Sequence, residues 1–215
     1  MKIVLRISSW VLILVLLVIL SGSAWLLLDT HGLPPMSALA AYAPLQSQVA
    51  PPLSCGGQAH VVLPVSAMGY VKDAFIAAEM RGDSTRYVAA NISRIVLCPP
   101  WKNLPQAMRE EREMAQLRLH FSHEELLSIE LNSANFGGDI YGLHNASGFY
   151  FRRPANELTI SQAAQLAGMP QHPAHYRNHP DAWLTRRNAI LGKMSENGSI
   201  STAEADAASR LPLGQ

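Results

Sequence analysis

The segment from Asn132 to Ala146, NSANFGGDIYGLHNA, has a composition and spacing that amphipathic helix packing alone does not require. Its three glycines, Gly137, Gly138 and Gly142, mark positions where the backbone must take a positive φ or approach another group closely. Loops of this kind often lie beside binding and catalytic sites. We therefore expect the segment to form a loop close to a functional site.

A second group of residues that could bind a ligand or a metal is the histidine cluster His172, His175 and His179. Histidines bind metals when their spacing brings their nitrogens together, as two histidines four residues apart on one helix do. Here the stretch PQHPAHYRNHP has prolines on both sides, which argues against a helix. We interpret the three histidines as loop residues and predict no metal site.

Capping signals place helices on both sides of the glycine-rich loop. Ser122 and Glu125 form a capping box, in which each side chain satisfies a free backbone donor of the other, and the helix is predicted to run to about Leu131. Three further helices are predicted: one opened by Thr159 to Gln162 and ending near Gly168, a long one from Pro180 closed by Gly198, and a short one capped by Ser201 to Glu204.

Two helical patterns precede the loop. Residues 71–82 are rich in alanine and lead to Glu79, and Gly82 closes them as a helix C-terminus. Residues 104–119 alternate apolar side chains with many arginines and glutamates, as an amphipathic surface helix does. The chain is therefore predicted to be mainly α-helical.

An apolar segment at residues 10–28 follows Lys2 and Arg6 and is long enough to cross a membrane as one helix. A cleaved signal peptide is the alternative, but it usually has a shorter apolar region with a small-residue cleavage site directly after it. The positive-inside rule places residues 1–9 in the cytoplasm and the rest of the chain outside. We predict a single-pass protein of a bacterial inner membrane with a periplasmic domain.

Residues 29–70 are rich in Pro, Ala and Ser and are predicted to form a linker or an arm on the surface. The net charge of +1 excludes the basic footprint of a nucleic-acid-binding protein. Cys55 and Cys98 both follow the apolar segment, in a compartment that permits disulfides. Either a bridge between them or two separate thiols is compatible with the sequence.

The order of these features resembles the glycosyltransferases of family 51, the peptidoglycan polymerases of the bacterial cell envelope. The resemblance runs from about Val71 to Ser201 and is strongest from Leu126 onward, where LLSIELN, the glycine-rich loop and RRPANELTISQAAQLAGMP follow in the family's order. It implies a lysozyme-like helical domain at residues 71–210. About thirty residues of the family pattern are missing after Glu79, which implies a reduced smaller lobe.

The resemblance also implies a reaction, in which a sugar hydroxyl of one lipid-linked disaccharide attacks the anomeric carbon of another and displaces a lipid diphosphate. The match of Ala74 to Glu79 with the family's first motif makes Glu79 the general base. Glu113 and Arg109 would orient the diphosphate, with Arg112 as a further cation. A divalent metal such as magnesium is implied at the diphosphate, although the sequence shows no ligand set for it.

Substrate-binding residues are carried over from the second and fourth family motifs: Ser84, Thr85, Asn132, Gly137 and Tyr141. The chain departs from the family at other positions. Met80 replaces an aspartate, Val88 and Ala89 replace paired glutamines, and Glu110 replaces a lysine.

These departures keep a second function open, that of a non-catalytic relative that binds lipid-linked precursor, glycan strand or another cell-wall synthesis protein. A glycan-cleaving lytic enzyme would also use one glutamate in a lysozyme-like fold. The order of the motifs favours the polymerases over this third class.

Overall fold

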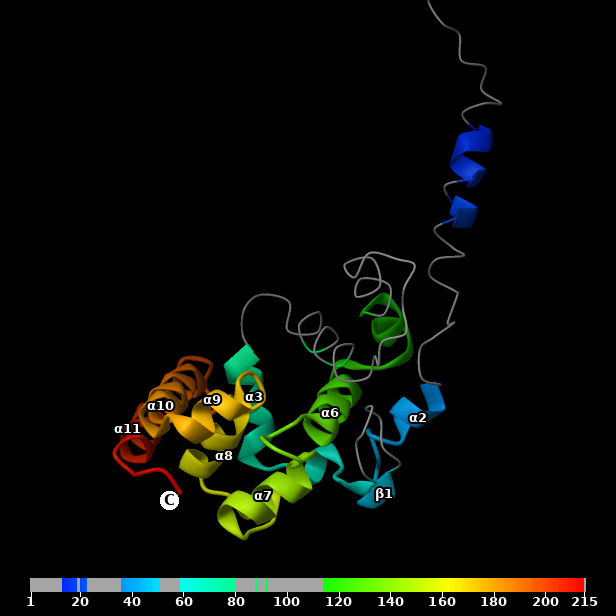
Figure 1. The fold of residues 1–215 in the computed structure, drawn as a ribbon. Helices are drawn as coiled ribbons and strands as arrows, with labels where there is room; N and C mark the ends of the chain where they lie inside the picture. Colours follow the sequence, from blue (N-terminus) through cyan, green and yellow to red (C-terminus); the bar gives the residue numbers. More distant parts are fainter. Residues whose placement is uncertain are drawn as a thin grey trace, which may run out of the picture.

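The computed structural model describes residues 13–18, 20–22, 36–50, 59–79, 88, 92 and 114–214 of the chain. Within these residues the protein is mainly α-helical, with one two-stranded antiparallel sheet (Figure 1). The predicted mainly α class is confirmed.

The centre of the helical part is formed by α3 (Tyr70–Glu79), α8 (Ile160–Gly168) and α10 (Pro180–Glu196). Both α8 and α10 pack against α3, and α11 (Thr202–Ser209) packs against α8 and α10. Every residue of α8 after Ile160 is buried. Four of its nine residues are alanine or glycine, and such small side chains let two neighbouring helices approach it closely. The end of α3 is therefore held by two neighbours distant in sequence.

Three helix starts follow the capping chemistry of the sequence. Capping boxes begin α6 (His123–Ser133), α8 and α11, and a proline occupies the first turn of α10. Gly198 follows α10 with a φ of +79°, in the left-handed conformation that closes a helix. The four helices predicted after residue 120 are therefore confirmed.

The arm that the sequence predicted over residues 29–70 is part of the core in its described portions. It contains α2 (Met36–Ala40), β1 (Gln48–Ala50), β2 (His60–Val62) and the 3₁₀ turn η1 (Val65–Ala67). In the sheet, Gln48 lies opposite Val62 and Ala50 opposite His60. Its buried apolar side chains are Leu39, Tyr42, Ala50, Val62, Leu63 and Met68. These side chains attach the described parts of the segment to the core, whereas the sequence predicted a linker or a surface arm.

Besides α2, two helices among the described residues were not predicted. One is α7 (Leu143–Phe151), which begins after Gly142. The other is α9 (Pro173–Asn178), which corrects the interpretation of the histidine cluster as a loop, because His175 lies within it and His172 and His179 cap its ends. Proline at the first helical position is compatible with a helix, so Pro173, inside this stretch, marks a start.

The predicted helix at 104–119 is described only from residue 114, and residues 114–120 are helical. Of the apolar segment 10–28, the described residues 13–18 and 20–22 are helical and exposed. Among the residues that the structure describes, no helix has the length and apolar character needed to cross a membrane.

Candidate functional site

The glycine-rich loop connects α6 to α7 as a tight turn closed by its own backbone. The Phe136 N–H donates to the Ile140 carbonyl at 2.8 Å, and the Gly142 N–H donates to the Ala134 carbonyl at 2.9 Å. Inside the turn, the Asn135 side chain accepts from the Gly137 N–H at 2.6 Å. The turn therefore needs no ligand to hold its shape.

Gly142 is required by its surroundings as well as by its backbone. Its φ is +78°, and a Cβ at this position would lie 2.7 Å from the Asn132 carbonyl oxygen and 2.7 Å from the His60 ring. His60 Nε2 is itself 2.6 Å from that carbonyl oxygen. The loop is therefore pressed against β2, which the sequence had assigned to an arm.

Gly137 likewise combines a positive φ with a close approach of neighbouring side chains. Its φ is +112°, and a Cβ would meet Cδ of Arg177 at 2.7 Å and the Tyr150 hydroxyl at 3.2 Å. That hydroxyl donates to the Phe136 carbonyl at 2.7 Å. Burial raises the pKa of Tyr150 against the opposing effect of the Arg177 charge, so the phenol stays a donor at neutral pH. Residues of α7 and α9 thus brace the loop.

Asn132 lies in the core at the end of α6, with 0% of its surface exposed. Its side-chain oxygen accepts from the Leu63 N–H at 2.9 Å, and its amide nitrogen donates to the carbonyls of Tyr42 and Leu63 at 2.9 and 2.8 Å. The amide nitrogen also lies 3.2 Å from the Ser128 hydroxyl. These contacts commit the side chain to joining α6 to the arm, while Tyr141 at the loop's end is half-buried.

Glu79 is the last residue of α3, and its helix end is fixed by a cation from α10. The Arg186 guanidinium donates to the Ala78 carbonyl at 3.3 Å. A cation at a helix C-terminus also interacts favourably with the helix dipole. Arg186 reaches this position across Gly168, where a Cβ would lie 2.9 Å from the arginine Cγ.

The other predicted catalytic and diphosphate-binding residues lie outside the described residues, as do the two cysteines: Ser84, Thr85, Arg109, Arg112, Glu113, Cys55 and Cys98. Their roles stay predictions. Val88, which the resemblance matched to a family glutamine, is described and is buried, with 1% of its surface exposed.

A metal site is not formed by the described residues, because no three histidine, cysteine, aspartate or glutamate side chains converge among them. In the histidine cluster, the rings of His175 and His179 stack with centroids 4.4 Å apart. Magnesium at the diphosphate therefore stays a prediction. The described residues form no ligand set for it.

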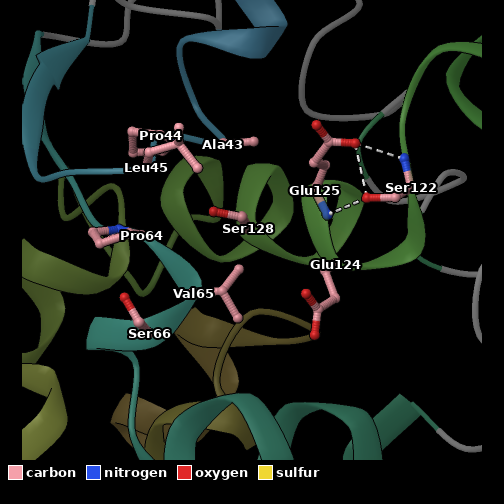
Figure 2. Close-up of a pocket in the computed structure, with 10 residues that line it drawn as sticks. All are labelled: Ala43, Pro44, Leu45, Pro64, Val65, Ser66, Ser122, Glu124, Glu125 and Ser128. Carbon is pink, nitrogen blue, oxygen red and sulfur yellow. Dashed lines mark hydrogen bonds between the residues drawn. The ribbon is translucent and has the colours of Figure 1, made fainter.

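A pocket of about 360 Å³ lies between the start of α6, residues 43–45 and residues 64–66 (Figure 2). Glu124 and Glu125 give it an acidic side, but the Glu125 carboxylate accepts from the N–H and hydroxyl of Ser122, both at 2.8 Å. These bonds lower the pKa of Glu125, the backbone bond most strongly. Neither Glu79 nor the glycine-rich loop lines this pocket, so it is not the predicted transfer site.

Comparison with known proteins decides the family, because the transglycosylase family model matches residues 68–195, more than half of the chain. The chain belongs to the transglycosylase family. The matched region begins just before α3 and ends within α10, so it includes Glu79, the glycine-rich loop and the helices that support them.

Several curated proteins resemble this chain. Penicillin-binding protein 1F of Bacillus subtilis is 32% identical over 145 residues, which cover 66% of this chain and 20% of that protein. Penicillin-binding protein 1C of Escherichia coli is 36% identical over 107 residues, which cover 48% of this chain and 14% of that protein. A crystal structure of penicillin-binding protein 1A from Haemophilus influenzae is 22% identical, with a TM-score of 0.46, covering 79% of this chain and 21% of that one. The chain thus spans about a fifth or less of these relatives.

Sequence reasoning missed the residues that hold the site in place: His60, Tyr150, Arg177 and Arg186. His60 begins a short apolar run, and Tyr150 lies in an aromatic run. Arg177 lies in the proline-flanked histidine stretch, and Arg186 lies in the helix predicted from Pro180. No local signal distinguishes them, because their partners are distant in sequence.

Proposed function

We propose that this chain is a membrane-anchored peptidoglycan glycosyltransferase that polymerises glycan strands from lipid-linked disaccharide. Glu79 takes the proton from the acceptor hydroxyl as the new C–O bond forms at the anomeric carbon of the donor. The bond to the lipid diphosphate breaks with inversion. Arg109, Arg112 and Glu113 orient that diphosphate, which leaves as an anion stabilised by positive charge.

The observation that carries this proposal is the position of Glu79 within the family match. It ends a helix that two other helices and the Arg186 contact hold in place. A general base must be fixed relative to the proton it accepts, and rigid elements supply that precision better than loops do.

The test uses the full chain in detergent with labelled lipid-linked disaccharide. Glu79→Gln keeps the shape of the side chain and removes its basicity, so polymer formation should fall about a hundredfold or more. Glu196→Gln is the matched control, because Glu196 and Glu79 are each the last residue of a helix, α10 and α3. Glu196 is exposed. Equal activity of Glu79→Gln and native protein would refute the assignment of the base.

A non-catalytic relative that binds lipid-linked precursor or glycan is the second candidate. Val88 favours it, because a buried apolar residue stands where the family has a polar glutamine. If the native chain forms no polymer while an intact family member does under the same conditions, the enzymatic proposal fails. Retained affinity for the labelled precursor would then support the binding role.

Membrane anchoring by residues 10–28 is part of the proposal. In spheroplasts, external protease should remove an epitope attached after Gln215 and spare one attached before Met1. Release of a soluble mature chain would instead identify residues 10–28 as a signal peptide.

A further inference from the structure

The pocket at the start of α6 has two chemically different sides (Figure 2). Glu124 and Glu125 lie on one side of it, and Pro44, Leu45 and Pro64 lie on the other. No lysine, arginine or histidine is among the described residues that line the pocket. The described lining therefore combines a negative side with an apolar side and contains no cation that would balance the charge.

The donors nearest to the pocket are already used, which disfavours an anionic ligand. Ser128 lies between the two sides, and its hydroxyl is directed to the carbonyls of Tyr42 and Leu63, 3.2 and 3.4 Å away. At the helix start, the N–H groups of Ser122 and Glu125 donate within the capping box. These groups therefore have no proton left for a carboxylate or a phosphate.

The negative side is not cancelled by the dipole of α6. A helix N-terminus carries about half a unit of positive charge, whereas each ionised carboxylate contributes a full negative charge. The backbone N–H of Ser122 and, more weakly, its hydroxyl lower the pKa of the Glu125 carboxyl, so this group stays ionised at neutral pH. Both bonds use Oε2, and Oε1 makes no hydrogen bond with a described residue. Glu124 is exposed, so the pocket can present both carboxylates to a cation.

The size of the pocket and its rim indicate what kind of cation fits. Its volume of about 360 Å³ is at the lower end of the range for ligand pockets, which suits one long side chain. A lysine has an aliphatic stem and a terminal ammonium, so its two parts match the two sides. At the rim, Leu45 has 96% of its surface exposed. A free amine would leave Leu45 in water, whereas a polypeptide that inserts a lysine can cover it with a neighbouring residue.

We propose that this pocket is a docking site for a lysine side chain presented by a partner polypeptide. The ammonium donates to the carboxylates of Glu124 and Glu125, and an apolar residue beside the lysine contacts Leu45. Neither Glu79 nor the glycine-rich loop lines the pocket. The docking site therefore goes beyond the proposed transfer reaction and does not depend on it.

The experiment follows the fluorescence anisotropy of a dye-labelled peptide, acetyl-Gly-Leu-Lys-Gly amide, as the full chain in an uncharged detergent is added. A second peptide replaces the lysine by norleucine, which keeps the stem and removes the charge. The native chain should bind the lysine peptide about tenfold more tightly than the norleucine peptide, and added salt should reduce this difference. Unlabelled cadaverine, a free amine of similar stem length, should compete only weakly because it does not cover Leu45.

Three variants test the two sides of the pocket. Glu124→Gln and Leu45→Ser should each weaken binding of the lysine peptide about threefold. Glu125→Gln should have a similar effect while the helix start is kept, because glutamine also completes a capping box. Glu204→Gln is the matched control, since Glu204 closes the capping box of α11 in the same way, and it should bind as the native chain does.

Equal affinity for the lysine and norleucine peptides would overturn the proposal, as would unchanged binding by Glu124→Gln and Leu45→Ser. Competition by cadaverine as strong as that of the unlabelled lysine peptide would overturn the polypeptide partner and identify a site for a free amine. If the native chain forms no glycan polymer yet binds the lysine peptide through these residues, the proposed transfer reaction fails and this inference stands.

Discussion

At the scale of single residues, the glycine-rich loop is shaped by contacts that its own sequence does not reveal. The glycines and Asn132 were identifiable from composition and spacing, and the structure gives both a physical reason. The glycines make room for His60 and Arg177, and Asn132 satisfies buried backbone groups of the arm. What the sequence could not provide was the identity of these partners, which lie far away in the chain.

Replacing Asn132 with alanine should destabilise the fold strongly. The substitution leaves the Leu63 N–H and the carbonyls of Tyr42 and Leu63 buried without their side-chain partner. We expect a loss of about 2–4 kcal/mol in the free energy of unfolding, measured by urea denaturation. Asn156→Ala changes an exposed asparagine and should stay within about 0.5 kcal/mol of native. A similar small effect at Asn132 would contradict the hydrogen-bond network.

Gly142→Ala should also destabilise the protein, by about 2 kcal/mol or more, because it adds a clash to a strained φ. The matched control is Gly192→Ala, within α10, where nothing lies within 4 Å of the new Cβ. Alanine is favoured over glycine in a helix, so this control should gain about 0.5–1 kcal/mol. Thermal unfolding of the two variants should therefore shift in opposite directions.

At the scale of elements, helices with local start signals were predictable and those defined by tertiary contacts were not. The capping boxes at Ser122, Thr159 and Ser201 each involve residues within a span of four, so the local sequence is enough to predict them. The helix α7 contains asparagine and an internal glycine, both poor helix formers, and it is held by the loop and by Trp183. The described parts of the arm are held by the burial of their apolar side chains and by the hydrogen bonds of Asn132 to Tyr42 and Leu63.

Ser122→Ala tests the first capping box and its dependence on pH. Loss of the cap should reduce the free energy of unfolding by about 1 kcal/mol at pH 7. The pKa of Glu125 is lowered in the folded state, so its contribution is present above its usual value of 4.5 and disappears as pH falls through the folded pKa. The difference in free energy of unfolding between native protein and variant should therefore become smaller as the pH falls. Ser66→Ala, at an exposed serine, should show no pH-dependent gap.

Gly168→Ala tests whether the contact between α8 and α10 positions Glu79. The new Cβ would displace Arg186 and weaken its bond to the Ala78 carbonyl. If Glu79 is the base, polymer formation should fall about tenfold through kcat, with KM changing little. An unchanged kcat in a variant that folds normally would show that this contact serves stability alone.

At the scale of the whole molecule, Arg187 joins three parts of the chain through one buried cation. It has 0% of its surface exposed and donates to the carbonyls of Ser209 at 2.8 Å and Leu211 at 2.7 Å. It also reaches the Ser161 hydroxyl of α8 at 3.2 Å. Burial lowers the pKa of this guanidinium, and the carbonyl groups offset the cost of removing its charge from water.

Arg187→Met should destabilise the helical centre by about 3 kcal/mol or more, because it leaves several carbonyls without a donor. Arg187→Lys should recover only a part of this, since one ammonium group cannot reproduce the planar fork of a guanidinium. Urea denaturation gives both values, and Arg210→Met, at an exposed arginine, is the control. Hydrogen exchange adds a spatial test: protection should fall in α11 and in the N-terminal turn of α8 before it falls in α6. A uniform loss across the chain would instead show that Arg187 supports the fold as a whole rather than the attachment of its C-terminal helix.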